Sequence, residues 1–120
     1  MPCPHPLEPI YRTTHGAVYR CRGCRWVNIC FGPIILAYDT AGLFRFARLI
    51  REMASARGNE PACTERCHYL RTPDRQIGFA FTADEVRELD ALLDGAAAML
   101  DLEKMLEETL GPPARRPGPS

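Results

Sequence analysis

The sequence predicts an α+β protein in which a small antiparallel sheet is packed on one face by two helices. Residues 17–21 and 26–31 are rich in β-forming side chains and flank the short connection CRGC, which indicates a hairpin with a zinc-knuckle-like tip. Apolar residues recur at helical spacing over residues 41–55. A helix-capping signature at Thr82 opens a second and longer helical pattern.

Length and composition favour a single folded unit. The chain has 120 residues, of which 46% are hydrophobic and 25% charged, as in ordinary globular proteins. We expect one α+β domain over residues 1–110, with a metal-binding N-terminal segment, and a disordered tail over residues 111–120. Neither a signal peptide nor a membrane span is expected, and a cytoplasmic location follows. There the six cysteines would stay reduced.

The first half of the chain supplies most of the predicted sheet. Residues 1–9 contain four prolines and no periodic apolar pattern, so an extended lead-in that needs an anchor is expected. After the CRGC hairpin, a Gly-Pro step breaks the chain, and the apolar residues 34–38 predict a third strand in a central position. Residues 69–71 and 77–81 predict two further short strands.

Two helices complete the predicted fold. Asp39 or Thr40 can accept hydrogen bonds from the free amides of a first helix over about residues 41–55. For the second helix, the Thr82 hydroxyl and the Glu85 carboxylate can each satisfy a backbone amide at the start. Both starts are therefore defined by polar side chains.

The second helix is longer than the rest of the domain can cover. If it runs unbroken over residues 82–110, it is about 40 Å long at about 1.5 Å per residue. Either Gly95 introduces a kink, or a second apolar stripe along the helix packs against the same stripe of another copy. We prefer the second possibility, which predicts a homodimer formed through helix 82–110.

Charge is unevenly spread although the net charge is zero. Residues 10–58 carry eight arginines against two acids, whereas residues 82–110 carry nine acids against two basic residues. The two halves can attract each other within the fold, which we prefer, or the basic half can attract an anionic partner. The second possibility predicts a nucleic-acid-binding regulator that uses Arg12, Arg20, Arg22, Arg25 and the arginine face of the first helix, with Tyr19, Trp26 and Phe31 as stacking residues.

The CRGC pair supplies two of the four ligands that a tetrahedral zinc site needs. Two sets complete it, namely Cys3, His5, Cys21 and Cys24, or Cys21, Cys24, Cys63 and Cys67 with His68 as a substitute. We prefer the first set, because the proline-rich lead-in has no other visible reason to be ordered. Alternatively, no metal binds and the cysteines are scattered thiols.

The other cysteine and histidine residues have simpler predicted roles. A second alternative function is that of a thiol redox protein using Cys21 and Cys24. It is less favoured, because such a protein normally has the first cysteine of its CxxC pair at a helix N-terminus, whereas the residues after Cys24 are strand-like. Cys30 is expected to be a small buried side chain, and His15 a surface turn residue rather than a replacement for His5.

Several short motifs occur together in a recognisable order. They are C-x-H (Cys3, His5), HG-x4-CxxC (His15, Gly16, Cys21, Cys24), F-G (Phe31, Gly32) and F-T-x-x-E-x-x-x-L-x-x-L-L-x-x-A over residues 81–96. This order resembles a family of small uncharacterised bacterial proteins known only as a domain of unknown function, over most of residues 3–106. The resemblance implies that Cys3, His5, Cys21 and Cys24 act as one set, and it implies no activity.

These observations predict a non-catalytic interaction module stabilised by a structural Zn²⁺. The sequence contains no Ser-His-Asp set, paired-carboxylate motif, HExxH motif or phosphate-binding glycine loop. A site made of thiolates and one imidazole has no open position for water, so the metal would stabilise the fold rather than catalyse a reaction.

Overall fold

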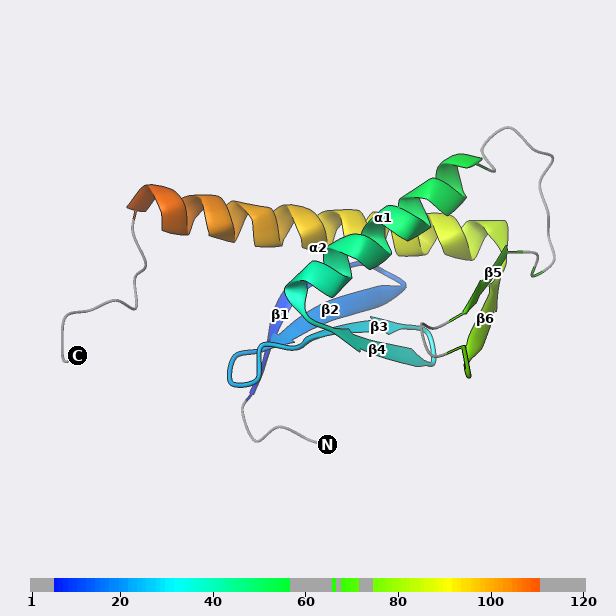
Figure 1. Cartoon of the computed structure of the whole chain (residues 1–120), viewed down its shortest axis with the longest axis horizontal. Coiled ribbons are helices and arrows are strands. Elements are labelled where there is room, and N and C mark those ends of the chain that lie inside the picture. Colours follow the sequence, from blue (N-terminus) through cyan, green and yellow to red (C-terminus); the bar gives the residue numbers. More distant parts are fainter. Residues whose placement is uncertain (1–5, 57–65, 67, 72–74, 111–120) are drawn as a thin grey trace.

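A computed structural model describes residues 6–56, 66, 68–71 and 75–110 of the protein. Its strands are β1 (Leu7–Arg12), β2 (Gly16–Cys21), β3 (Val27–Phe31), β4 (Ile34–Tyr38), β5 (His68–Arg71) and β6 (Gly78–Phe81), and its helices are α1 (Thr40–Ala56) and α2 (Ala83–Leu110). Both helices lie on the same face of the larger sheet (Figure 1). The predicted α+β class is confirmed.

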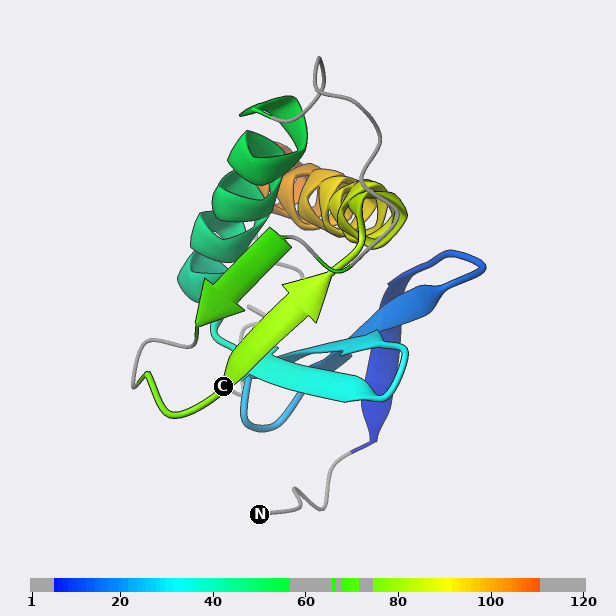
Figure 2. The same cartoon turned by 90° about the vertical axis from the view of Figure 1, so that its right-hand side faces the viewer.

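The strands form two antiparallel sheets. β1 to β4 follow one another in the order β1-β2-β3-β4, and β5 pairs with β6 in a separate two-stranded sheet. Figure 2 shows this second sheet beside α1 at one end of the molecule. The two strands predicted after the first helix are therefore confirmed as a pair, although they do not join the main sheet.

Two sequence-based expectations about the main sheet are wrong. The proline-rich segment expected to be a lead-in contains β1, which pairs with β2 from Leu7 to Arg12. Proline is tolerated there because β1 is an edge strand, and Pro9 precedes a bulge in the register. The strand expected in a central position, β4, is the other edge, and its Ile35 is 69% exposed.

The core lies between the helices and one face of the sheet. In β3, Val27, Ile29 and Phe31 are buried and alternate with partly exposed residues, as the two-residue period of a strand requires. The helix residues that bury their side chains against this face include Leu43, Phe46 and Ile50 of α1 and Leu89, Leu92, Leu93 and Ala96 of α2.

Both helix starts are capped as predicted. The Gly42 amide donates to Asp39 Oδ1 at 2.7 Å, so Asp39 is the cap of α1. At α2 the Thr82 amide donates to Glu85 Oε1 at 2.9 Å, and the Glu85 amide donates to Thr82 Oγ1 at 3.1 Å. These two reciprocal bonds are the predicted capping box.

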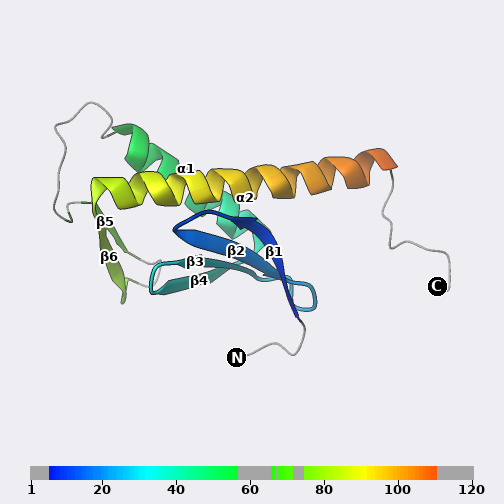
Figure 3. The same ribbon diagram turned by 180° about the vertical axis from the view of Figure 1, so that it is seen from behind.

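The long helix α2 continues without interruption through Gly95 (Figure 3). Gly95 has a packing role, because the ring of Tyr11 lies against its backbone. A Cβ atom at this position would be 2.1 Å from Tyr11 Cε2, far inside contact distance. The glycine therefore allows β1 to approach the middle of α2.

Candidate metal centre

The turn between β2 and β3 wraps its backbone around Cys21. The Cys21 amide donates to the Trp26 carbonyl oxygen, and the Arg25 amide donates to the Cys21 carbonyl oxygen, both at 2.9 Å. Within this turn the Cys24 amide donates to Cys21 Sγ at 3.3 Å. A backbone N–H directed at sulfur stabilises the thiolate, which is the form that binds metal.

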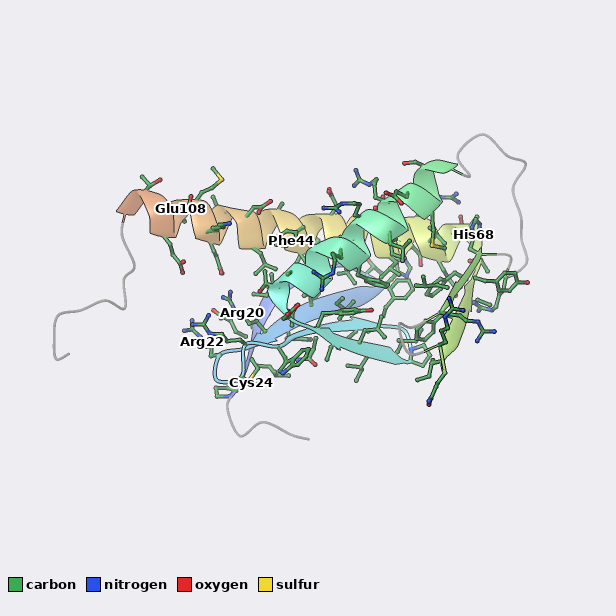
Figure 4. The ribbon with its side chains drawn as sticks, viewed as in Figure 1. Arg20, Arg22, Cys24, Phe44, His68 and Glu108 are labelled. Atoms are coloured by element: carbon green, nitrogen blue, oxygen red, sulfur yellow. The ribbon has the colours of Figure 1, made fainter. Side chains whose placement is uncertain are left out.

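Arg25 closes the turn in a left-handed conformation, with φ of 64°. This region is unfavourable for residues other than glycine and asparagine, so the backbone is held there by the surrounding hydrogen bonds. The two cysteines differ in access. Cys21 is 1% exposed at the end of β2, whereas Cys24 is exposed at the hairpin tip, as Figure 4 shows.

The start of β1 lies directly across from the turn. Leu7 and Cys21 are partners in the β1–β2 register, so the chain enters the sheet beside the CRGC cysteines. Of the preferred ligand set, Cys3 and His5 lie outside the described residues. Residues 6–56, 66, 68–71 and 75–110 contain no group of three or more His, Cys, Asp or Glu side chains placed to hold a metal ion.

His68 is the one described residue of the second candidate ligand set besides Cys21 and Cys24. It is 4% exposed at the start of β5, opposite Phe81. Figure 4 places His68 at the end of the molecule that carries β5 and β6, and Cys24 well away from it at the β2–β3 turn. His68 therefore cannot share a metal ion with Cys24, while Cys63 and Cys67 lie outside the described residues.

His15 and Cys30 lie away from the candidate centre. His15 is an exposed residue of the turn before β2, with its Nε2 3.3 Å from Glu88 Oε2, so its predicted turn role is confirmed. The expectation that Cys30 is buried is wrong, because its side chain is only partly buried. The alternation of β3 gives Ile29 and Phe31 to the core and turns Cys30 to the outer face.

An ion-pair network beside the turn connects the sheet to α2. Arg20 donates to both carboxylate oxygens of Glu103, at 2.7 and 3.0 Å, and to Glu8 at 3.0 Å. Arg22 donates to the other oxygen of Glu8 at 2.9 Å. The hydrogen bond with Glu103 and then that with Glu8 raise the pKa of Arg20, and the hydrogen bond with Arg20 lowers the pKa of Glu8.

These contacts consume much of the basic surface that a nucleic acid would need. Besides Arg20 and Arg22, Arg51 pairs with Asp90 at 2.9 Å and with Asp94 at 3.0 Å. The preferred interpretation of the charge pattern, attraction between the two halves of the fold, is thus confirmed for Arg20 and Arg51, which pair with acids of α2, whereas Arg22 pairs with Glu8 of β1. Of the predicted stacking residues, Phe31 is in the core at 8% exposed.

The position of Cys21 differs from the usual position of a redox cysteine at the start of a helix. Cys21 ends strand β2 and does not begin a helix, so no helix dipole acts on its sulfur.

The end of α2 beyond the sheet presents apolar side chains to solvent. Glu103 is partly buried, and residues 104–109, which follow it, are all exposed. The large exposed apolar residues on either side of Glu103 are Met99, Leu102, Met105 and Leu106. Neither α1 nor the longer α2 has the apolar length that a bilayer crossing demands.

Comparison with protein-family models, with curated proteins and with solved structures finds no match for this chain.

Proposed function

We propose that the protein is a non-catalytic interaction module, working in a reducing cytoplasm, whose N-terminal segment is fastened to the sheet by a structural Zn²⁺ held by Cys3, His5, Cys21 and Cys24. The observation that carries this proposal is the hydrogen bond from the Cys24 amide to Cys21 Sγ. It lies in a turn that faces the entry of β1, the strand that follows Cys3 and His5.

The chain length before β1 is sufficient for the proposed ligands. A chain spans at most about 3.6 Å per residue, so the two residues from Leu7 back to His5 reach about 7 Å and the four back to Cys3 about 14 Å. Because Leu7 is the partner of Cys21, both distances allow coordination at the CRGC tip. Exposure of Cys24 leaves its sulfur accessible from that side.

The charges around the turn also favour a thiolate site. Three thiolates and a neutral imidazole around Zn²⁺ carry a net charge of about −1, by the usual ligand charges. Arg22 and Arg25 flank Cys24 in the sequence, and both are exposed. A cation close to a thiolate stabilises it and compensates residual negative charge; Arg25 can act in this way, whereas Arg22 already pairs with Glu8.

Zinc would give the edge strand β1 an anchor. β1 contains a proline and a bulge, and it pairs with one neighbour only. Both features weaken a strand. A metal ion that joins the residues before β1 to the β2–β3 turn contributes its binding free energy to folding.

The interaction surface of the proposed module is the apolar stripe on α2, and the partner that packs against it is a second copy of the chain. Met99, Leu102 and Leu106 are three and four residues apart, so they lie on one side of the helix. A two-fold axis would let the same stripe of both copies pack together, which is the commonest arrangement in homo-oligomers.

Thiol protection tests the proposed metal centre. In protein purified without chelator, Cys24 should react slowly with an alkylating reagent, because zinc-bound thiolates are shielded. After a chelator is added, the rate of alkylation of Cys24 should rise. Cys30, which lies outside the proposed centre, serves as the internal reference. Fast alkylation of Cys24 that does not respond to the chelator would count against the metal and in favour of an open thiol pair.

A further inference from the structure

A cavity between α1, the end of β4 and the β5–β6 sheet combines apolar walls with two cationic side chains. It has a volume of about 240 Å³ and opens where α1 begins, between the end of β4 and the β5–β6 sheet. Figure 1 shows α1 running above β4 towards the end of the molecule that carries β5 and β6. Its apolar lining residues are Tyr38, Phe46, Leu49, Leu70 and Phe79.

The first turn of α1 shapes one wall of this cavity. A Cβ atom at Gly42 would lie 3.1 Å from Tyr38 Cβ and Cδ1 and 2.9 Å from Asp39 Oδ1. The absence of a side chain at Gly42 therefore lets the Tyr38 ring lie close against the helix. There it stacks on Phe46, with ring centroids 5.3 Å apart and planes inclined by 29°. Burial raises the pKa of the Tyr38 phenol, which stays a neutral hydrogen-bonding group.

Two arginines at the cavity are not neutralised by the part of the chain that the structure describes. Arg45 and Arg71 both line the cavity, and none of its described lining residues is acidic. Within the described ranges, neither guanidinium has an ion-pair partner, whereas Arg20, Arg51 and Arg66 each do. Arg71 donates to the carbonyl oxygen of Arg75 at 3.4 Å, which leaves most of its donors available.

We propose that this cavity binds a small organic anion, with an apolar body between Tyr38, Leu70 and Phe79 and a carboxylate or phosphate group at Arg45 and Arg71. Apolar walls with a few polar groups that fix orientation are the usual composition of a small-molecule site. Guanidinium groups bind both kinds of anion through paired hydrogen bonds. The volume lies below the usual range of about 300–1,000 Å³, which limits the body to a single ring or a short chain.

Titration with simple aromatic anions, followed by amide NMR on the full-length protein, tests this proposal. Phenylacetate and phenyl phosphate should each cause saturable shifts of the Leu49, Leu70 and Phe79 amides at millimolar concentration. The stronger binder of the two identifies the preferred anionic group. Phenylacetamide, which has the same ring without the charge, should bind at least about tenfold more weakly, the loss expected for one charge-assisted interaction.

Charge-removing variants separate specific recognition from surface attraction. Arg45→Gln and Arg71→Gln should each weaken binding of the better anion about tenfold. Arg48→Gln, which removes an exposed arginine of α1 that does not line the cavity, should leave affinity unchanged. The proposal is overturned if neither anion gives saturable shifts, if phenylacetamide binds as well as phenylacetate, or if Arg48→Gln weakens binding as much as Arg71→Gln.

Discussion

The Cys24 amide donates a hydrogen bond to Cys21 Sγ over 3.3 Å, within a turn that Arg25 completes in the left-handed region at φ of 64°. The consequence is a backbone that surrounds one sulfur while it presents the other to solvent. Since Leu7 lies across from Cys21, the described part of the chain enters the sheet beside this turn. The turn is therefore suited to hold two ligands of a site completed by the N-terminal segment.

The conformation of Arg25 can be tested by comparing Arg25→Gly with Arg25→Ala. Both changes remove the charge, but only glycine relieves the left-handed backbone, which costs other residues about 1–2 kcal/mol. We expect Arg25→Gly to be more stable than Arg25→Ala by about 1 kcal/mol in urea unfolding. A glycine variant no more stable than the alanine variant would contradict the strained turn.

Gly95 offers a test in which two effects have opposite signs. Replacing glycine by alanine inside a helix normally stabilises it by about 1 kcal/mol. Here the new Cβ would lie 2.1 Å from Tyr11 Cε2, so we expect Gly95→Ala to lower the free energy of unfolding by about 1–3 kcal/mol.

Removal of the Tyr11 ring is the control for the Gly95→Ala variant. In a Tyr11→Ala background, Gly95→Ala should become stabilising, because the normal helix preference is then unopposed. Ala98→Gly, at an exposed position of the same helix, should cost about 1 kcal/mol in either background. Stabilisation by Gly95→Ala in the otherwise unchanged protein would show that Tyr11 does not pack as described.

The capping box at α2 predicts a pH-dependent contribution from Glu85. The hydrogen bond from the Thr82 backbone amide, together with the Arg66 side chain, lowers the pKa of Glu85. A carboxylate with a depressed pKa in the folded protein stabilises it above the unfolded pKa, about 4.3 for glutamate, and loses this contribution as the pH falls through the folded pKa.

Urea unfolding at neutral pH and near pH 3 checks this prediction. Glu85→Ala should lower the free energy of unfolding by about 1 kcal/mol at neutral pH and by less at the lower pH. Glu107→Ala, at the exposed end of the same helix, should have little effect at either pH. An equal cost of Glu85→Ala at both pH values would mean that its charge does not contribute to the cap.

Self-association through α2 predicts that charges within its apolar stripe separate the copies. Leu102→Glu combined with Leu106→Glu should convert a dimer to a monomer in sedimentation equilibrium, because like charges then face each other in an apolar contact. Lys104→Glu changes the net charge by the same amount at an exposed non-apolar position of α2, and the dimer should persist. A monomeric parent protein at high concentration would contradict the proposed interface.

Local signals in the sequence predicted most elements of this fold. The CRGC hairpin follows from β-forming residues around a short turn, and α2 begins at the capping box formed by Thr82 and Glu85. These features depend on residues close in sequence. The position of β4 at the sheet edge depends on which strands meet in space, so its apolar composition alone led to the wrong central placement.

The surroundings of the candidate centre were harder to predict. Arg20 and Glu103 are 83 positions apart, and their contact exists only because α2 packs across β1 and β2. β1 itself was missed because a proline such as Pro9 is normally excluded from a strand and is tolerated only at an edge position. In β3 alternate side chains face the core, so Cys30 points away from it while Ile29 and Phe31 point towards it. The sequence predicts this alternation but does not say which of the two faces is the core face.

The zinc content of protein purified without chelator tests the proposed function most directly. We expect one zinc ion per chain by elemental analysis, and its loss in both Cys24→Ser and Cys3→Ser. Cys63→Ser, which removes a cysteine outside the preferred ligand set, should retain the metal. Well under one zinc per chain in the parent protein, or loss of zinc in Cys63→Ser but not in Cys3→Ser, would contradict the proposed centre.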